Sequence, residues 1–177
     1  MADLVTHIGL AFLVKGLTRK PHTASFVLGN VLPDLGGRAI GMGLTLLVHQ
    51  GAPVPEDLIF GFGVLHLPLG ILALCGLLAL PFRRDLRRSV FLNLLGGCFL
   101  HLALDLLQRH TGTGYPLLFP FTTWHWELGL IGSEATVPVS VPLLLAGAGL
   151  WWRRVGRSVD DQRSDEAGRV LGADEQG

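Results

Sequence analysis

The chain has 177 residues, of which 49% are hydrophobic and only 16% are charged, and its formal net charge at pH 7 is zero. An average soluble domain carries about 25% charged residues, so this chain is short of side chains to cover a water-facing surface. The composition argues against a soluble globular protein and favours an integral membrane protein surrounded by lipids. The lack of a basic excess also argues against nucleic acid as a partner.

The first fifty residues predict one helix and one broken element. We expect an N-terminal helix from Ala2 to Leu17, whose apolar part is too short to cross a membrane alone. Residues 23–48 are long enough to cross, but Pro33 and Asp34 interrupt them. We therefore expect the chain to turn near Pro33–Asp34, with a helix over residues 37–48 after the turn.

Three apolar segments in the rest of the chain predict transmembrane helices. The first, Leu58–Phe82, has no formal charge, and at about 1.5 Å per residue it exceeds a hydrocarbon core of roughly 30 Å. Pro68 lies inside this segment and predicts a kink or a tilt. The second segment runs from Ser89 to Gln108 and the third from Ala135 to Trp152. Residues 50–57 and 110–134 are the expected loops.

The chain divides into an apolar body and a polar end. We expect residues 1–152 to form an all-α membrane bundle of about four to five helices with a polar site inside it. Residues 153–177, which hold five Arg and six acidic residues, are expected to form a disordered tail.

Three basic clusters predict the orientation. They lie at the end of the N-terminal helix, after the segment Leu58–Phe82 and after the last apolar segment, and the positive-inside rule places all three, and the tail, in the cytoplasm. The clusters are Lys15, Arg19 and Lys20; Arg83, Arg84, Arg87 and Arg88; and Arg153, Arg154 and Arg157. The expected protein is thus a multi-pass protein of the cell membrane.

The strongest chemical signal is the pair His101 and Asp105. An ionisable side chain at the centre of a membrane helix costs about 2.5–3.5 kcal/mol, so such positions are informative. The i, i+4 spacing puts the imidazole and the carboxylate on one helical face. The pair can be a hydrogen-bonded contact that fixes helix packing, or part of a metal or catalytic site.

Three further residues could join this pair, although each also has a local explanation. Asp34 follows the proline break, where a buried turn lines a cavity, but it could equally cap the next helix. His66 and His7 could each form a local hydrogen bond instead. Helical rise places His66 and His101 at similar depth in the outer half of the membrane. We predict one cavity, open to the outer face, that contains His7, Asp34, His66, His101 and Asp105.

Four stretches together resemble a known family. They are THIGLAF (6–12), LGNVLPDL (28–35), LHLPLG (65–70) and GGCFLHLALDLLQRHTGTGYPLLFP (96–120). In this order they are similar to the inner-membrane-associated metal-dependent hydrolases, which are also described as LexA-binding. The resemblance implies an inner-membrane location and places the metal site at His7, Asp34, His66, His101 and Asp105. The chain departs from the family pattern at Gly36, where a second Asp is common, and at Gly61, where a His is common.

Two functions follow from these residues. In the first, the protein is an enzyme, because three His and two Asp suit a divalent ion such as Zn²⁺ or Mn²⁺. The ion would promote hydrolysis of an ester or phosphoester, on a small-molecule or lipid-linked substrate, with Asp34 or Asp105 as general base or orienting group. In the second, the protein is not a catalyst, and the same residues hold helices together or bind a structural metal.

Overall fold

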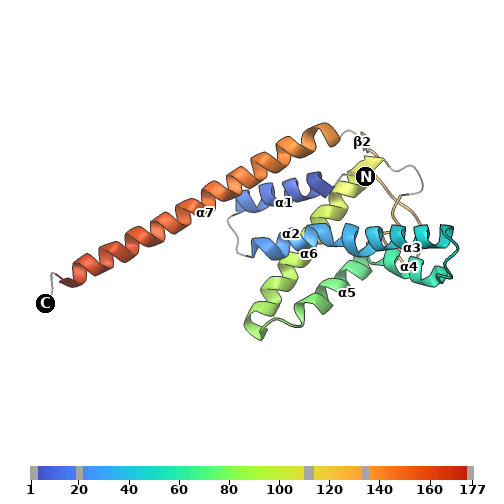
Figure 1. Cartoon of the computed structure of the whole chain (residues 1–177), viewed down its shortest axis with the longest axis horizontal. Helices are drawn as coiled ribbons and strands as arrows, with labels where there is room; N and C mark the ends of the chain where they lie inside the picture. The colour runs from blue at the N-terminus through green and yellow to red at the C-terminus, as the bar shows by residue number, and fades with distance from the viewer. Residues whose placement is uncertain (1–3, 19–21, 110–113, 133–135, 175–177) are drawn as a thin grey trace.

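The structure, a computed structural model, describes residues 4–18, 22–109, 114–132 and 136–174, with side chains up to residue 157. The described chain is mostly helical, which confirms the all-α class (Figure 1). Its elements are α1 (Leu4–Thr18), α2 (Thr23–Leu32), the π-helix η1 (Pro33–Ala39), α3 (Ile40–His49), α4 (Glu56–Val64), α5 (Pro68–Ala79), α6 (Arg84–Leu107), β1 (Gln108–Arg109), β2 (Ile131–Gly132) and α7 (Val137–Asp174). The two short strands pair in parallel.

The expected turn at Pro33–Asp34 is absent, because α2, η1 and α3 form one continuous helix from Thr23 to His49. Pro33 keeps a helical φ of −60°. A proline disrupts an ordinary α-helix because it lacks the N–H group and crowds the preceding turn. Here the wider π-helical turn accommodates it. Such π segments occur often at functional sites, and this one carries Asp34.

The kink expected near Pro68 is present. Helices α4 and α5 are bent by 81° relative to each other, and Leu67 between them has an extended backbone with ψ 156°. Pro68 then occupies the first turn of α5, where its missing N–H group leaves no helical bond unmade. The break places His66 between the two helices, facing the rest of the bundle with 6% of its surface exposed.

Two helices in the described residues are long and apolar enough to cross a membrane, namely Thr23–His49 and α6. The bent pair α4–α5 is a third if it counts as one span. This supports a membrane protein but does not confirm a bundle of four to five spans. The segment predicted over Ala135–Trp152 coincides with the start of α7, which is not among these spans. Prolines within it and the arginines that follow reduce its apolar character.

Glycines bring the helices into close contact. Helix α2 packs on α6, and a Cβ at Gly97 would overlap the carbonyl oxygen of Phe26, while a Cβ at Gly29 would overlap that of Leu94. Helix α1 packs on α7 in the same way, and a Cβ at Gly147 would come within 2.6 Å of the Gly9 carbonyl oxygen. Small residues let helix backbones approach each other. The apolar core between α5 and α6 consists of Ile71, Cys75, Val90, Leu94, Cys98 and Leu102.

The C-terminal segment differs from the disordered tail that the composition predicts. The backbone of α7 continues as a helix to Asp174, and in Figure 1 its second half extends away from the other helices. A helix that has already formed extends at low cost, and no proline follows Pro142 in α7. The polar composition therefore indicated where α7 stops packing against the other helices, but it did not determine the backbone conformation of this segment.

Removing residues 157–177 should leave membrane insertion and metal content unchanged, because the described part of this segment, up to Asp174, extends away from the helices that hold the polar residues. The check compares the membrane fraction and the metal content of the truncated and full-length proteins after expression at equal levels. Truncated protein that is synthesised normally but fails to insert would contradict the expectation.

Candidate metal centre

The structure brings together the five polar residues that the sequence singles out, from four separate parts of the chain. His7 comes from α1, Asp34 from η1, His66 from the break between α4 and α5, and His101 with Asp105 from α6. Asp34 joins the others without any turn at Pro33, because the continuous helix Thr23–His49 carries it directly alongside α6.

The Asp105 carboxylate is the centre of the cluster. The Nε2 atoms of three imidazoles surround it: His7 lies 3.3 Å from Oδ1, and His66 and His101 lie 3.1 and 3.4 Å from Oδ2. The Tyr115 hydroxyl donates a hydrogen bond of 2.7 Å to Oδ2. Asp105 itself is fully buried. An ionised carboxylate buried in this way is stable only when it is paired, and these neighbours are the groups that can pair it.

A backbone contact orients His101. Its Nδ1 atom lies 2.7 Å from the carbonyl oxygen of Asn30, which can only accept, so Nδ1 carries the proton and donates it. In the neutral ring the Nε2 atom then presents its lone pair to Asp34 and Asp105. The Asn30 side chain donates to the carbonyl oxygen of Gly97 at 3.2 Å, which fixes α2 against α6. Metal-binding histidines are commonly oriented by a second bond of this type.

Several buried polar atoms of the cluster have no hydrogen-bond partner among the described residues. They are Nδ1 and Nε2 of His7, Oδ1 of Asp34, Nε2 of His101 and Oδ1 of Asp105. Buried polar groups in folded proteins are nearly always paired. Here imidazole nitrogens and carboxylate oxygens face each other, and either a proton on an imidazole or a cation bound between these atoms would pair them. The donor set therefore fits a divalent metal ion.

Two overlapping groups of residues could hold such an ion, and in each the ligand atoms lie within 4.8 Å of one another. The first group is His7, His101 and Asp105, and the second is Asp34, His66 and His101. Both groups use His101, whose single free nitrogen can bind one ion only. We therefore interpret the groups as a single centre around His101 rather than two separate metal sites. The rings of His7 and His101 are stacked at 3.8 Å.

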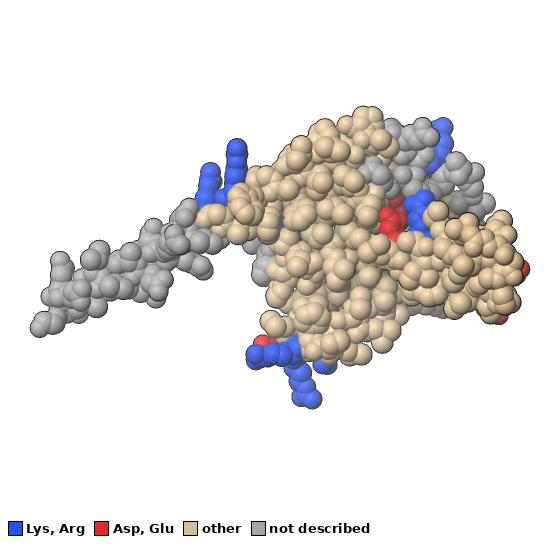
Figure 2. All heavy atoms as spheres, viewed as in Figure 1, with Lys and Arg blue, Asp and Glu red and all other residues tan. Residues whose placement is uncertain are grey.

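The cluster opens on the side of Asp34. The side chains of His7, His101 and Asp105 are at most 1% exposed, whereas those of His66 and Asp34 are 8% and 14% exposed. Beyond Asp34 lies Arg38, with Nη1 3.7 Å from Oδ1 and 37% of its side chain exposed. Figure 2 shows an acidic and a basic patch in contact on this face, over the segment between α2 and α3. Asp34 is thus the most exposed of the five residues of the cluster.

Sequence reasoning missed three residues that shape the centre, namely Asn30, Arg38 and Tyr115. Asn30 and Arg38 stand four residues before and after Asp34, so their helical spacing could have indicated a shared face. Tyr115 is the one tyrosine of the chain and lies in a loop, where no periodicity points to it. Burial, with the Asp105 carboxylate beside it, raises the pKa of the Tyr115 hydroxyl, so the hydroxyl remains a donor.

Replacing Tyr115 by phenylalanine should lower the metal affinity about 10- to 100-fold, the usual effect of losing a group that orients a ligand. The ring that stacks on His66 at a centroid distance of 5.4 Å would remain, and only the hydroxyl donor to Asp105 would be lost. The check is a metal titration of the metal-free protein in detergent. Equal affinities of Tyr115→Phe and wild type would show that the hydroxyl does not support the centre.

The two departures from the family pattern lie in open space. A Cβ at Gly36 would contact only the Cδ2 atom of Leu74, at 3.9 Å, and a Cβ at Gly61 would meet nothing within 4 Å. Packing therefore does not require glycine at either position. The convergence of His7, Asp34, His66, His101 and Asp105 does not depend on a side chain at these two positions.

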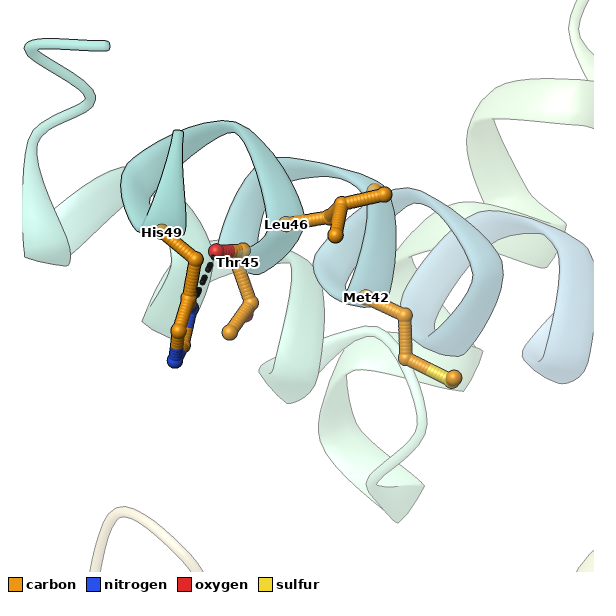
Figure 3. A pocket seen from close by; sticks show the side chains of 5 residues that line it. Met42, Thr45, Leu46 and His49 are labelled. Carbon is orange, nitrogen blue, oxygen red and sulfur yellow. Dashed lines mark hydrogen bonds between the residues drawn. The ribbon is translucent and has the colours of Figure 1, made fainter. Parts of the chain in front are cut away.

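A shallow depression elsewhere on the molecule does not belong to the centre. It lies on α3 and is lined by Met42, Gly43, Thr45, Leu46 and His49 (Figure 3). The His49 ring donates to the Thr45 carbonyl oxygen at 2.8 Å, within the same helix. Because one helix forms the whole lining, the depression is a feature of its exposed face rather than a substrate cavity.

Comparisons of the chain with protein-family models, with curated proteins and with solved structures found no match. The resemblance drawn from the four sequence stretches therefore stands on those motifs alone. The geometry of the cluster is independent of it.

Proposed function

We propose that the protein is a membrane-bound, metal-dependent hydrolase that acts on an ester or phosphoester of a small-molecule or lipid-linked substrate. The observation that carries the proposal is the buried set of unpaired nitrogen and oxygen atoms around His101 and Asp105. Three imidazoles and two carboxylates form a mixed set that suits Zn²⁺ or Mn²⁺. The family resemblance supports the same five residues.

Each residue has a role in this proposal. His7, His66, His101 and Asp105 would hold the ion, and Asp34 would lie beside it, since its Oδ1 is 3.8 Å from Nε2 of His101. A divalent ion bound here would supply Lewis-acid polarisation of the scissile group and a water activated at neutral pH. Asp34 would orient that water or remove its proton. Asp105 would be a shared ligand, since both of its oxygens lie beside the Nε2 atoms of the three imidazoles.

One observation favours a second candidate, a structural metal in a protein without catalytic activity. His7, His101 and Asp105 are almost completely buried, and an ion held by these three alone would be closed to substrate. Structural metal sites are closed in this way, whereas catalytic sites keep one position open. The two candidates therefore differ in whether the ion has an open position on the side of Asp34, where a substrate could bind.

The test combines metal analysis with hydrolysis of a panel of chromogenic esters and phosphoesters by detergent-purified protein. The hydrolase proposal expects stoichiometric metal and hydrolysis of at least one substrate. Asp34→Asn should lower that hydrolysis about 10²- to 10⁴-fold, the usual contribution of a general base, while metal remains bound to the buried ligands. Stoichiometric metal without hydrolysis supports the structural candidate, and absence of metal contradicts both.

We further propose an inner-membrane protein with a cytoplasmic C-terminal tail. The end of α1, the α5–α6 connection and the middle of α7 all lie toward the left of Figure 1, and basic side chains gather at two places on that side in Figure 2. This fits the positive-inside rule.

The orientation can be tested by cysteine labelling. Because Cys75 and Cys98 are buried, a cysteine introduced at Leu86 can be labelled selectively. We expect an impermeant reagent to label this cysteine only after the cells are permeabilised. Labelling in intact cells would show that the orientation is the reverse of the one proposed.

A further inference from the structure

The guanidinium of Arg38 lies at the open side of the metal centre and is only loosely paired. Its Nη1 atom is 3.7 Å from Oδ1 of Asp34, which is longer than a hydrogen bond. The two side chains are one helical turn apart on the continuous helix Thr23–His49. The arginine is also more exposed than the aspartate, at 37% against 14%. Arg38 is therefore placed to contact a molecule before that molecule reaches Asp34.

The surroundings of Arg38 make a permanently unsatisfied charge unfavourable. Leu28, Leu35 and Ile40 on the same helix are exposed to between 42% and 49%, and the helix is long and apolar enough to cross a membrane. Arginines within membrane segments face polar partners or an aqueous cavity and are commonly part of functional sites. The partner that the structure gives Arg38 is the Asp34 carboxylate.

Binding of a divalent ion would leave the charge of Arg38 without a counterion. The two carboxylates of the cluster, Asp34 and Asp105, would together balance the two charges of the ion. The histidines are neutral when they bind a metal. One positive charge, that of Arg38, is then left over at the open side of the centre. It calls for one anionic group from outside the protein.

We propose that Arg38 binds the phosphate group of an anionic phosphoester substrate, so that phosphoesters rather than neutral carboxylic esters are the substrate class of this centre. This inference rests on the proposed function, because it requires the ion to occupy the centre. Phosphate fits because the planar guanidinium forms two parallel hydrogen bonds with its oxygens. A neutral ester would leave the guanidinium unpaired beside the ion.

The experiment measures phosphate binding by the manganese-loaded protein in a neutral detergent, using the Mn²⁺ electron paramagnetic resonance signal, with metal content determined separately. Wild-type protein should show a phosphate-dependent change of the signal. Arg38→Gln should weaken phosphate binding about 10- to 100-fold, as expected for loss of hydrogen bonds to a charged group. Arg38→Lys keeps the positive charge but loses the pair of parallel hydrogen bonds that a guanidinium can donate. It should give a phosphate affinity between those of wild type and Arg38→Gln.

The matched control is Arg88→Gln, which removes the same charge from an exposed position near the start of α6 and should leave phosphate binding unchanged. Phosphate binding that is equal in Arg38→Gln and wild type overturns the inference, as does metal-loaded wild-type protein that binds no phosphate. In both cases the metal centre itself would stand. Protein that binds no manganese or zinc overturns the proposed function, and this inference with it.

A second arm replaces inorganic phosphate by phosphatidic acid in the same detergent. If phosphatidic acid binds more tightly and still depends on Arg38, the phosphate is carried on a lipid. If inorganic phosphate binds equally well, the substrate is a water-soluble phosphoester. Both results support Arg38 as the phosphate-binding residue, and binding of phosphatidic acid that is unaffected by Arg38→Gln contradicts it.

Discussion

Replacing His101 by alanine should abolish stoichiometric metal binding. His101 belongs to both groups of possible ligands, and its Nε2 atom lies 3.4 Å from Asp105 and 3.8 Å from Asp34. Loss of this ring removes the one nitrogen that both groups share. Metal content of purified protein, measured by mass spectrometry, should fall from about one ion per chain to background, whereas loss of a merely supporting group costs 10- to 100-fold in affinity.

The matched control is His49→Ala. This ring is exposed at the end of α3 and bonds only to the carbonyl oxygen of Thr45 among the described residues. It should leave metal content unchanged, which separates loss of the centre from a general effect of removing an imidazole. The prediction is contradicted if His101→Ala protein is folded, elutes as wild type does and keeps its full metal content. The pair His101 and Asp105 would then be a contact that fixes helix packing.

Replacing Gly97 by alanine should destabilise the fold and disturb the centre together. A Cβ at this position would overlap the carbonyl oxygen of Phe26 and lie 2.6 Å from the backbone nitrogen of Asn30. These are backbone atoms, so no side chain can move aside, and α2 must shift away from α6. Overpacking of this kind costs roughly 1–3 kcal/mol. The shift would also displace the Asn30 carbonyl oxygen that orients His101.

The measurements are the thermal unfolding midpoint in detergent and the metal affinity of the same sample. Gly76→Ala is the matched control, because a Cβ at Gly76 on α5 would meet nothing within 4 Å. It should keep the metal affinity and, since alanine favours helix, not lower the midpoint. If Gly97→Ala has the same unfolding midpoint and the same metal affinity as wild type, α2 and α6 are not held at the distance that the structure gives.

A centre of this kind explains why polar residues persist in such an apolar chain. Lys15 gives a second example, since it is buried and donates a hydrogen bond of 2.8 Å from Nζ to Oδ1 of Asn93. In each case the polar group lies between helices rather than on the outer surface, as expected within a membrane. The partners come from different helices, so these contacts also fix how the helices are arranged.

The features that depend on local composition and spacing could be predicted from the amino-acid sequence. The apolar segments around Thr23–His49 and α6 follow from hydrophobic composition. The bend at Pro68 follows from the missing N–H group of proline. The shared face of His101 and Asp105 follows from helical periodicity. The candidate residues could be chosen in the same way, because an ionisable side chain in an apolar helix needs a reason to be there.

The way in which these parts fit together depends on contacts between distant segments, which the sequence pattern does not contain. Pro33 predicts a break, yet the helix continues through a π-helical turn, because that wider turn tolerates the missing N–H group. The polar composition of residues 153–174 predicts disorder, yet α7 continues, because an established helix extends at low cost. Tyr115 reaches Asp105 from a loop, and the Asn30 carbonyl oxygen orients His101. The contact between Asn30 and His101 depends on the close backbone approach at Gly29 and Gly97, which joins residues about 70 positions apart in the chain, and local spacing carries no information about such a distance.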